Sequence, residues 1–211
     1  MTIDFHTHQP TAEGVVTPRS FGFHPWHLAD YASERRTAPM AEPHIMQRFA
    51  EAHFVGECGL DKACNTPFDL QMTYLRWQLD IAEDLRKPVV LHCVHAFNEI
   101  IALRKHYSMP WVIHGFTGSL QLARQLASKD IGISFGAALL EPQRLKVRNT
   151  FQQWQGHYML ETDDNPCGID AVYSAAALIK GLPIDEIKAH VAAYYLLITT
   201  SNNQLSCQKE Q

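Results

Sequence analysis

Short apolar runs recur along the chain and alternate with amphipathic helical patterns. Each run is continuous and does not alternate with polar residues, as expected of strands that are buried on both faces of a parallel sheet. There are seven of them, at residues 3–5, 20–23, 54–56, 89–91, 111–113, 131–135 and 158–160.

The clearest helical pattern follows the third run. Phe68, Met72, Leu75, Leu79 and Ala82 are spaced by four and three residues, which places them on one face of a helix. Weaker patterns predict further helices, around residues 97–101, 122–126, 145–154 and 183–197.

The alternation of strands and helices predicts βα units and a parallel sheet, most simply an α/β barrel of the TIM type that occupies residues 1–211 as one domain. Seven strands are one fewer than such a barrel needs. Only fifteen residues separate His8 from His24, too few for a helix and a strand. We therefore expect the barrel to be incomplete or distorted by a deletion after its first strand. A doubly wound open sheet is the alternative, but no Gly-x-Gly-x-x-Gly motif follows any strand.

Composition narrows the class of protein. A chain that is 46% hydrophobic and 19% charged is ordinary for a soluble protein with a sizeable core. The net charge of −4 argues against a basic module that reads DNA sequence, but bound cations would still allow a nucleic-acid substrate. We expect a cytoplasmic protein without a membrane span or signal peptide. The scattered cysteines fit reduced thiols better than disulfides: Cys58, Cys64, Cys93, Cys167 and Cys207.

Histidines and carboxylates stand where the predicted strands end. In a barrel, the carboxyl ends of the strands carry the active site. One histidine at such a position is usually a structural residue, but a whole set in the same phase indicates a metal centre. The set consists of His6, His8, His24, Glu57, His92, His114 and Asp163.

The spacing of these residues suits divalent cations. His6 and His8 are two residues apart in an extended segment and so point to the same side. A glutamate such as Glu57 can bridge two cations through its two oxygens. Imidazoles mixed with carboxylates favour Zn, Mn, Fe or Ni, and Mg less exclusively. Two divalent metal ions about 3.5–4 Å apart would activate a water and stabilise a substrate oxyanion.

With these residues in view, the sequence resembles the TatD-like metal-dependent hydrolases, relatives of the amidohydrolase barrels. The matching segments follow the family's order and cover nearly the whole chain. They are Asp4-Phe5-His6-Thr7-His8, Gly22-Phe23-His24-Pro25, Gly56-Glu57-Cys58-Gly59-Leu60-Asp61, Pro88-Val89-Val90-Leu91-His92, Ile113-His114-Gly115-Phe116-Thr117-Gly118-Ser119 and Leu160-Glu161-Thr162-Asp163.

The resemblance implies a role for each residue. His6, His8 and Asp163 would hold one metal, His92 and His114 would complete the second, and Glu57 would bridge the two. Asp163 would also accept a proton from the nucleophilic water. His24 would contact the substrate's phosphate, and Asp61 would support the site from the loop after Glu57. Family members are typically described as nucleases or phosphoesterases that use divalent cations.

Departures from the family pattern concern substrate contacts more than metal ligands. The segment between His8 and His24 is much shorter than usual, and Gln9-Pro10 replaces the usual Leu-Asp. Cys93-Val94 follows His92 where the family often has Ser-Arg, and Lys62-Ala63-Cys64 replaces the usual tyrosines and arginine. The chemistry is therefore better indicated than the substrate.

Three functions remain open on the sequence alone. The favoured hypothesis is a metal-dependent phosphoesterase of the deoxyribonuclease type, acting on DNA or another phosphoester. The second is a hydrolase of a carbon–nitrogen or carbon–oxygen bond in a small molecule, which the lost arginine slightly favours. The third is a non-catalytic scaffold that keeps the metal for folding. Apolar edges of an incomplete barrel would also favour a homodimer.

Overall fold

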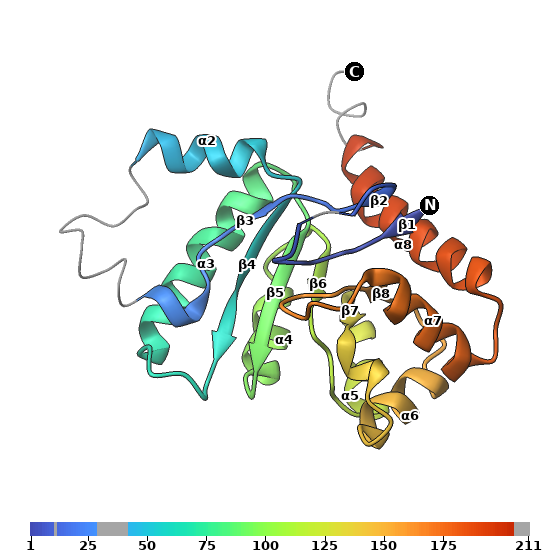
Figure 1. The fold of residues 1–211 in the computed structure, drawn as a ribbon. Coiled ribbons are helices and arrows are strands. Elements are labelled where there is room, and N and C mark those ends of the chain that lie inside the picture. The colour runs from blue at the N-terminus through green and yellow to red at the C-terminus, as the bar shows by residue number, and fades with distance from the viewer. Residues whose placement is uncertain (11, 29–41, 205–211) are drawn as a thin grey trace. The chain divides into compact units, whose positions relative to one another are not determined.

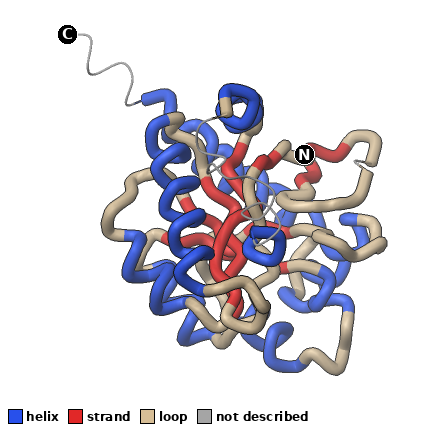
Figure 2. Tube along the Cα trace, turned by 90° about the vertical axis from the view of Figure 1, so that its left-hand side faces the viewer, coloured by secondary structure: helices blue, strands red, loops and turns tan. Residues whose placement is uncertain are grey.

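The strands are short and parallel, and helices separate most of them along the chain (Figures 1 and 2). The computed structural model describes residues 1–10, 12–28 and 42–204. The chain divides into two compact units. We call Arg19–Trp111 the middle unit, after its place in the sequence, and Met1–Pro18 with Val112–Gln211 the terminal unit. The single domain over residues 1–211 stays a prediction.

The middle unit contains three parallel strands in the order β3-β4-β5. Helix α3 packs on β4 through Leu75, Leu79 and Ala82, all fully buried, as the apolar spacing predicted. The elements of this unit are β3 (Ser20–Phe21), the 3₁₀ helix η1 (Pro25–His27), α2 (Pro43–Glu51), β4 (Phe54–Asp61), α3 (Phe68–Asp84), β5 (Val89–Val94) and α4 (Phe97–Arg104).

The terminal unit brings the two ends of the sequence together. Strand β1 pairs in parallel with β2, and the amide of Phe5 donates to the carbonyl of Leu160 at 3.0 Å, so the N-terminal segment runs beside β8. Strand β8 also pairs with β7. The elements of this unit are β1 (Thr2–Ile3), β2 (Val15–Val16), α5 (Leu120–Ala127), β7 (Ile131–Phe135), η3 (Ala137–Leu140), α6 (Leu145–Gln153), β8 (Met159–Leu160), α7 (Ile169–Lys180) and α8 (Ile184–Gln204).

Strand β6 (Trp111–Ile113) begins at the last residue of the middle unit. All seven predicted apolar runs contain or overlap a strand. An eighth strand, β2, was not predicted, because two valines between glycine and threonine give no run to recognise. Helices α2 and α7 were not predicted either. Strand β4 extends five residues beyond the predicted run, because Glu57, Gly59 and Asp61 interrupt the apolar pattern there.

The described residues bear on two expectations, the absence of a membrane span and the reduced state of the cysteines. No helix in the described part of the chain combines the length and apolar character needed to cross a bilayer. Cys207 lies outside the described residues. The other four cysteines are free of disulfides: Cys58, Cys64, Cys93 and Cys167.

A buried glutamine on α3 fixes the backbone just ahead of His24. The Gln78 side chain is fully buried. Its Oε1 accepts from the amide of Phe23 at 2.6 Å, and its Nε2 donates to the carbonyl of Phe23 at 3.2 Å. Because β3 ends at Phe21, these bonds satisfy backbone groups that the strand ladder no longer serves.

We expect Gln78→Leu to lower the free energy of unfolding by about 2–4 kcal/mol, because two buried backbone groups lose their partner. Urea unfolding of the purified protein measures the change. Gln152→Leu, at an exposed glutamine on α6, is the matched control and should shift stability by no more than about 0.5 kcal/mol. Equal stability of Gln78→Leu and wild type would contradict the role assigned to this side chain.

Candidate metal centre

Parallel backbone pairing in the terminal unit aligns the His-x-His segment with Asp163. The amide of Asp163 donates to the carbonyl of His6 at 2.9 Å, and the amide of His8 donates to the carbonyl of Asp163 at 3.1 Å. Thr7 and Asp163 form a parallel bridge. The pairing places the side chains of His6, His8 and Asp163 in one small region.

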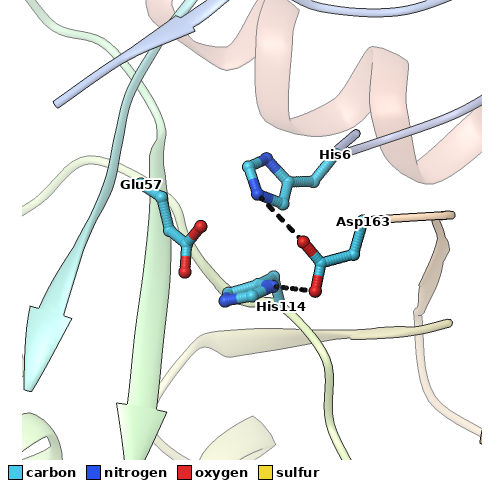
Figure 3. A group of neighbouring side chains, drawn as sticks. All are labelled: His6, Glu57, His114 and Asp163. Atoms are coloured by element: carbon cyan, nitrogen blue, oxygen red, sulfur yellow. Dashed lines mark ion pairs between the residues drawn. The ribbon is translucent and has the colours of Figure 1, made fainter. Parts of the chain in front are cut away.

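The Asp163 carboxylate lies among three imidazoles. Its Oδ1 is 3.8 Å from His6 Nε2 and 3.7 Å from His8 Nε2, and its Oδ2 is 3.8 Å from His114 Nδ1. Figure 3 shows His6 and His114 directed at the two carboxylate oxygens. These separations are too long for hydrogen bonds. Atoms that share one cation about 2.0–2.2 Å away lie about 3–4.4 Å from one another, which these distances match.

Burial distinguishes the three histidines. The His6 and His114 side chains are 4% and 8% exposed, whereas that of His8 is 52% exposed. Asp163 is 35% exposed and adopts a left-handed backbone conformation with φ of 53°. Asp164 offers a further oxygen in the same group as His8 and Asp163. The ligand set is therefore fixed on its inner side and open to solvent at His8.

The run before this aspartate is held by a buried carboxylate. Thr162 donates to Asp4 twice, from its amide to Oδ1 at 2.9 Å and from its hydroxyl to Oδ2 at 2.7 Å. Burial raises the pKa of Asp4, while the two bonds from Thr162 act in the opposite direction. Asp4 thus ties the end of the first strand to the segment that carries Asp163.

A bulge in the middle unit sets the position of Glu57. Val55 pairs with Val89, but Cys58 pairs with Leu91, so β4 has one residue more than β5 between these pairs. Gly56 has φ of 136°, and a Cβ atom there would lie 2.3 Å from the carbonyl oxygen of Val90. Only glycine fits this approach. The glycine before Glu57 is therefore required by the backbone at the bulge.

Two histidines of the middle unit face the Glu57 carboxylate. Glu57 Oε1 is 3.1 Å from His24 Nε2 and 2.9 Å from His92 Nδ1. The His24 and His92 rings meet edge to face, with centroids 4.4 Å apart. Together the three residues offer ligand atoms within 4.8 Å of one another. His24 Nδ1 accepts from the amide of Trp26 at 3.2 Å, which directs Nε2 toward Glu57.

Asp61 supports this group from the end of β4. Its Oδ2 accepts from Trp26 Nε1 at 2.7 Å and lies 3.3 Å from His92 Nε2. Burial acts to raise the pKa of Asp61, but the hydrogen bonds from Trp26, Ala63 and His92 outweigh it, so that the pKa lies below its usual value. Gln71 of α3 fixes the Asp61 backbone, accepting from its amide at 2.7 Å and donating to its carbonyl at 3.0 Å.

The structure thus places the predicted residues in two groups. His6, His8, His114 and Asp163 gather in the terminal unit, and His24, Glu57, Asp61 and His92 gather in the middle unit. The donor chemistry of both groups, imidazole nitrogen with carboxylate oxygen, fits a divalent transition cation. Two predicted roles involve residues of both units, namely the bridging of two metals by Glu57 and the sharing of one metal by His92 and His114. These roles stay predictions.

Each group adjoins an open cleft. In the middle unit, a cleft of about 470 Å³ is lined by Trp26, Asp61, Ala63, Cys64, Asn65 and Thr66. In the terminal unit, a cleft of about 410 Å³ is lined by Asp163 together with the turns at Gly115–Thr117 and Gly136–Ala138 and by the Arg144 side chain. The cleft of the terminal unit thus includes the proposed ligand Asp163, and the cleft of the middle unit includes Asp61, which contacts His92.

Comparison with known proteins decides the family. The model of the TatD related DNase family matches residues 11–196. The chain belongs to this TatD family. The match includes every proposed site residue except His6 and His8, which precede it. The resemblance inferred from the motifs is therefore confirmed.

Several relatives of the TatD family share part of this sequence. The human 3'-5' RNA nuclease TATDN2 is 32% identical over 143 residues, which are 64% of this chain and 18% of that protein. The uncharacterized metal-dependent hydrolase YjjV of Escherichia coli is 29% identical over 148 residues, 68% of this chain and 56% of that protein. The 3'-5' ssDNA/RNA exonuclease TatD of Erwinia amylovora is 25% identical over 201 residues, 81% of this chain and 73% of that protein. The matched region thus spans about a fifth of the human protein and about half of Escherichia coli YjjV.

A solved structure shows the fold. The crystal structure of YjjV from Escherichia coli superimposes with a TM-score of 0.70 at 23% identity, and the alignment covers 89% of this chain and 77% of that one. The predicted α/β fold of the TatD barrel type is confirmed. Alignment with only part of YjjV is consistent with an incomplete barrel.

Motif reading gave no role to Glu161, although the residue stands two positions before Asp163. Glu161 is fully buried, its Oε1 accepts from the amide of Gly115, and the same oxygen lies 3.6 Å from His114 Nδ1. Burial acts to raise the pKa of Glu161, but the hydrogen bond and charge of His114 outweigh it and lower the pKa. A carboxylate behind a ligating histidine orients the ring and raises its basicity.

We expect Glu161→Gln to weaken the binding of Zn²⁺ or Mn²⁺ by about tenfold to a hundredfold, because His114 loses the charge that orients it. Calorimetric titration of the metal-free protein measures the affinity. Glu186→Gln, at an exposed glutamate on α8, serves as the control and should bind as wild type does. Unchanged affinity in Glu161→Gln, with the fold intact by circular dichroism, would refute this role.

Proposed function

We propose that the chain is a divalent-metal-dependent phosphoesterase that hydrolyses single-stranded nucleic acid. The observation that carries the proposal is the Asp163 carboxylate with three imidazole nitrogens 3.7–3.8 Å from its oxygens, beside an open cleft. The Glu57 group of the middle unit would supply a second set of ligands. Both groups combine a carboxylate that can accept a proton with nitrogens that can hold a cation.

The residues of the chain would divide the chemistry among them. When bound, a divalent cation supplies a Lewis acid that lowers the pKa of water and draws charge from a phosphoryl oxygen. Asp163 is exposed enough to meet solvent and accepts the proton of the attacking water. The His24 ring, oriented by the hydrogen bond that its Nδ1 accepts from the amide of Trp26, would contact a phosphoryl oxygen of the substrate.

The negative charge of the substrate would have to be compensated by a positive side chain within the site, because the chain as a whole is acidic. The net charge of −4 provides no general attraction for a polyanion. Arg144 lines the same cleft as Asp163 and would supply a fixed positive charge. It would compensate for the arginine that the family often has after His92 and that is Val94 here. The names of the human and Erwinia relatives, an RNA nuclease and an ssDNA/RNA exonuclease, support the choice of substrate.

A second candidate is hydrolysis of a carbon–nitrogen or carbon–oxygen bond in a small molecule. The observation that favours it is Val94 in place of the expected arginine, which removes one phosphate contact next to His92. A panel of lactones and cyclic amides separates the candidates, because only this one leads to their turnover. A non-catalytic scaffold would instead lose thermal stability on chelation without having any activity to lose. The cytoplasmic location and the homodimer stay predictions.

The direct test is the release of nucleotides from a short end-labelled single-stranded DNA, with Mg²⁺ and Mn²⁺ in turn. We expect Glu57→Ala to lose about a hundredfold or more of the rate, since it removes the carboxylate that faces both His24 and His92. Glu51→Ala, at an exposed glutamate that ends α2, is the matched control and should keep wild-type activity.

Two results would overturn the proposal. Cleavage at equal rates by wild type and Glu57→Ala would show that another site, or a contaminant, does the work. Absence of any phosphoester hydrolysis by metal-loaded wild type, across DNA, RNA and a nitrophenyl phosphodiester, would shift the assignment to the small-molecule hydrolase.

A further inference from the structure

An exposed tryptophan in the middle unit is held rigidly beside the His24 group. Trp26 is 55% exposed, although large aromatic side chains are normally covered. Its Nε1 donates to Asp61 Oδ2 at 2.7 Å. The indole meets His24 edge to face with centroids 4.8 Å apart, and His92 likewise at 5.8 Å. Three partners thus fix the plane of a ring whose surface remains largely open.

The residues around Trp26 do not suit a phosphate group as ligand. The cleft that it lines also contains the Asp61 carboxylate and the polar side chains of Asn65 and Thr66. No lysine or arginine is among the described residues that line this cleft. The Asp61 carboxylate in the cleft wall would repel a second phosphate. A flat, uncharged ring with hydrogen-bond donors fits these walls best.

We infer that this cleft is a nucleobase subsite, in which the base of the nucleotide bound at His24 stacks on Trp26. The inference rests on the proposed function, which places the substrate's phosphate at His24. Stacking on an aromatic side chain accepts every base, because every base has a π face. Asn65, Thr66 and Asp61 add polar contacts at the edge of the ring. The prior fixation of the indole lowers the entropy that binding costs.

Binding can be measured without catalysis. The full chain, purified without added metal and again with Mg²⁺, is titrated with AMP and with ribose 5-phosphate, which differ only in the base. We expect AMP to quench tryptophan fluorescence saturably and to bind at least about tenfold more tightly than ribose 5-phosphate. Equal affinity for the two ligands would overturn the subsite.

Variants assign the effect to Trp26. Trp26→Ala should weaken AMP about tenfold and leave ribose 5-phosphate unchanged, whereas Trp26→Phe, which keeps a ring, should bind AMP within a few-fold of wild type and lose the quenching. Circular dichroism verifies that both variants fold. Undiminished AMP affinity in Trp26→Ala would refute the inference.

Kinetics on DNA provide a second readout. Trp26→Ala should raise KM about tenfold for a normal oligonucleotide and change kcat little, with no effect on an oligonucleotide whose terminal residues are abasic. Failure of the proposed function would appear differently, as AMP binding that depends on Trp26 in a protein that hydrolyses no phosphoester. Hydrolysis without any dependence on Trp26 would reject the subsite alone.

Discussion

The backbone pairing between residues 6–8 and Asp163 is the constraint on which the terminal unit's site depends. Two hydrogen bonds, of 2.9 and 3.1 Å, bring the first strand segment beside the segment that follows β8, more than 150 residues later. They determine that two imidazoles face one carboxylate oxygen at 3.7–3.8 Å. Asp4 and Thr162 reinforce the same alignment from the buried side. The grouping of imidazoles around Asp163 is therefore a consequence of main-chain register.

In the middle unit, a bulge and two glutamines hold the backbone next to the proposed site residues. Gly56 lets β4 approach the Val90 carbonyl and so directs Glu57 toward His24 and His92. Gln71 and Gln78, seven residues apart on α3, bind the backbone at Asp61 and Phe23. Polar groups buried in this way are stabilising only when every partner is present. The helix that covers β4 thus also holds the backbone at Phe23 and Asp61, next to the proposed site residues.

Much of this could be read from the sequence, for physical reasons. Continuous apolar runs identified the buried strands, since hydrophobic periodicity reports burial directly. Strand-end phase predicted His6, Glu57, His92 and Asp163 as site residues, and the structure places each of them near other ligand-type side chains. Strand β2 could not be found, because two residues carry no period. Helix α7 was not predicted, although its apolar positions recur at helical spacing: Ile169, Val172, Tyr173 and Ala176. The small residues between them obscured the pattern. Gln78 and Arg144 had no signal, because their roles arise from neighbours distant in sequence. Glu161 lies in a matched segment at a strand end, but its contact with the distant His114 could not be read from the sequence.

The central claim is that each unit holds its own divalent-cation ligands, so the most direct measurement is the stoichiometry of Mn²⁺ binding to the metal-free chain. Calorimetry or the spectroscopic signal of free Mn²⁺ gives the number of ions bound. The account predicts two per chain for wild type and for His106→Ala, an exposed histidine outside both groups. It predicts one for His6→Ala and one for His92→Ala. Binding that neither His6→Ala nor His92→Ala diminishes would contradict it.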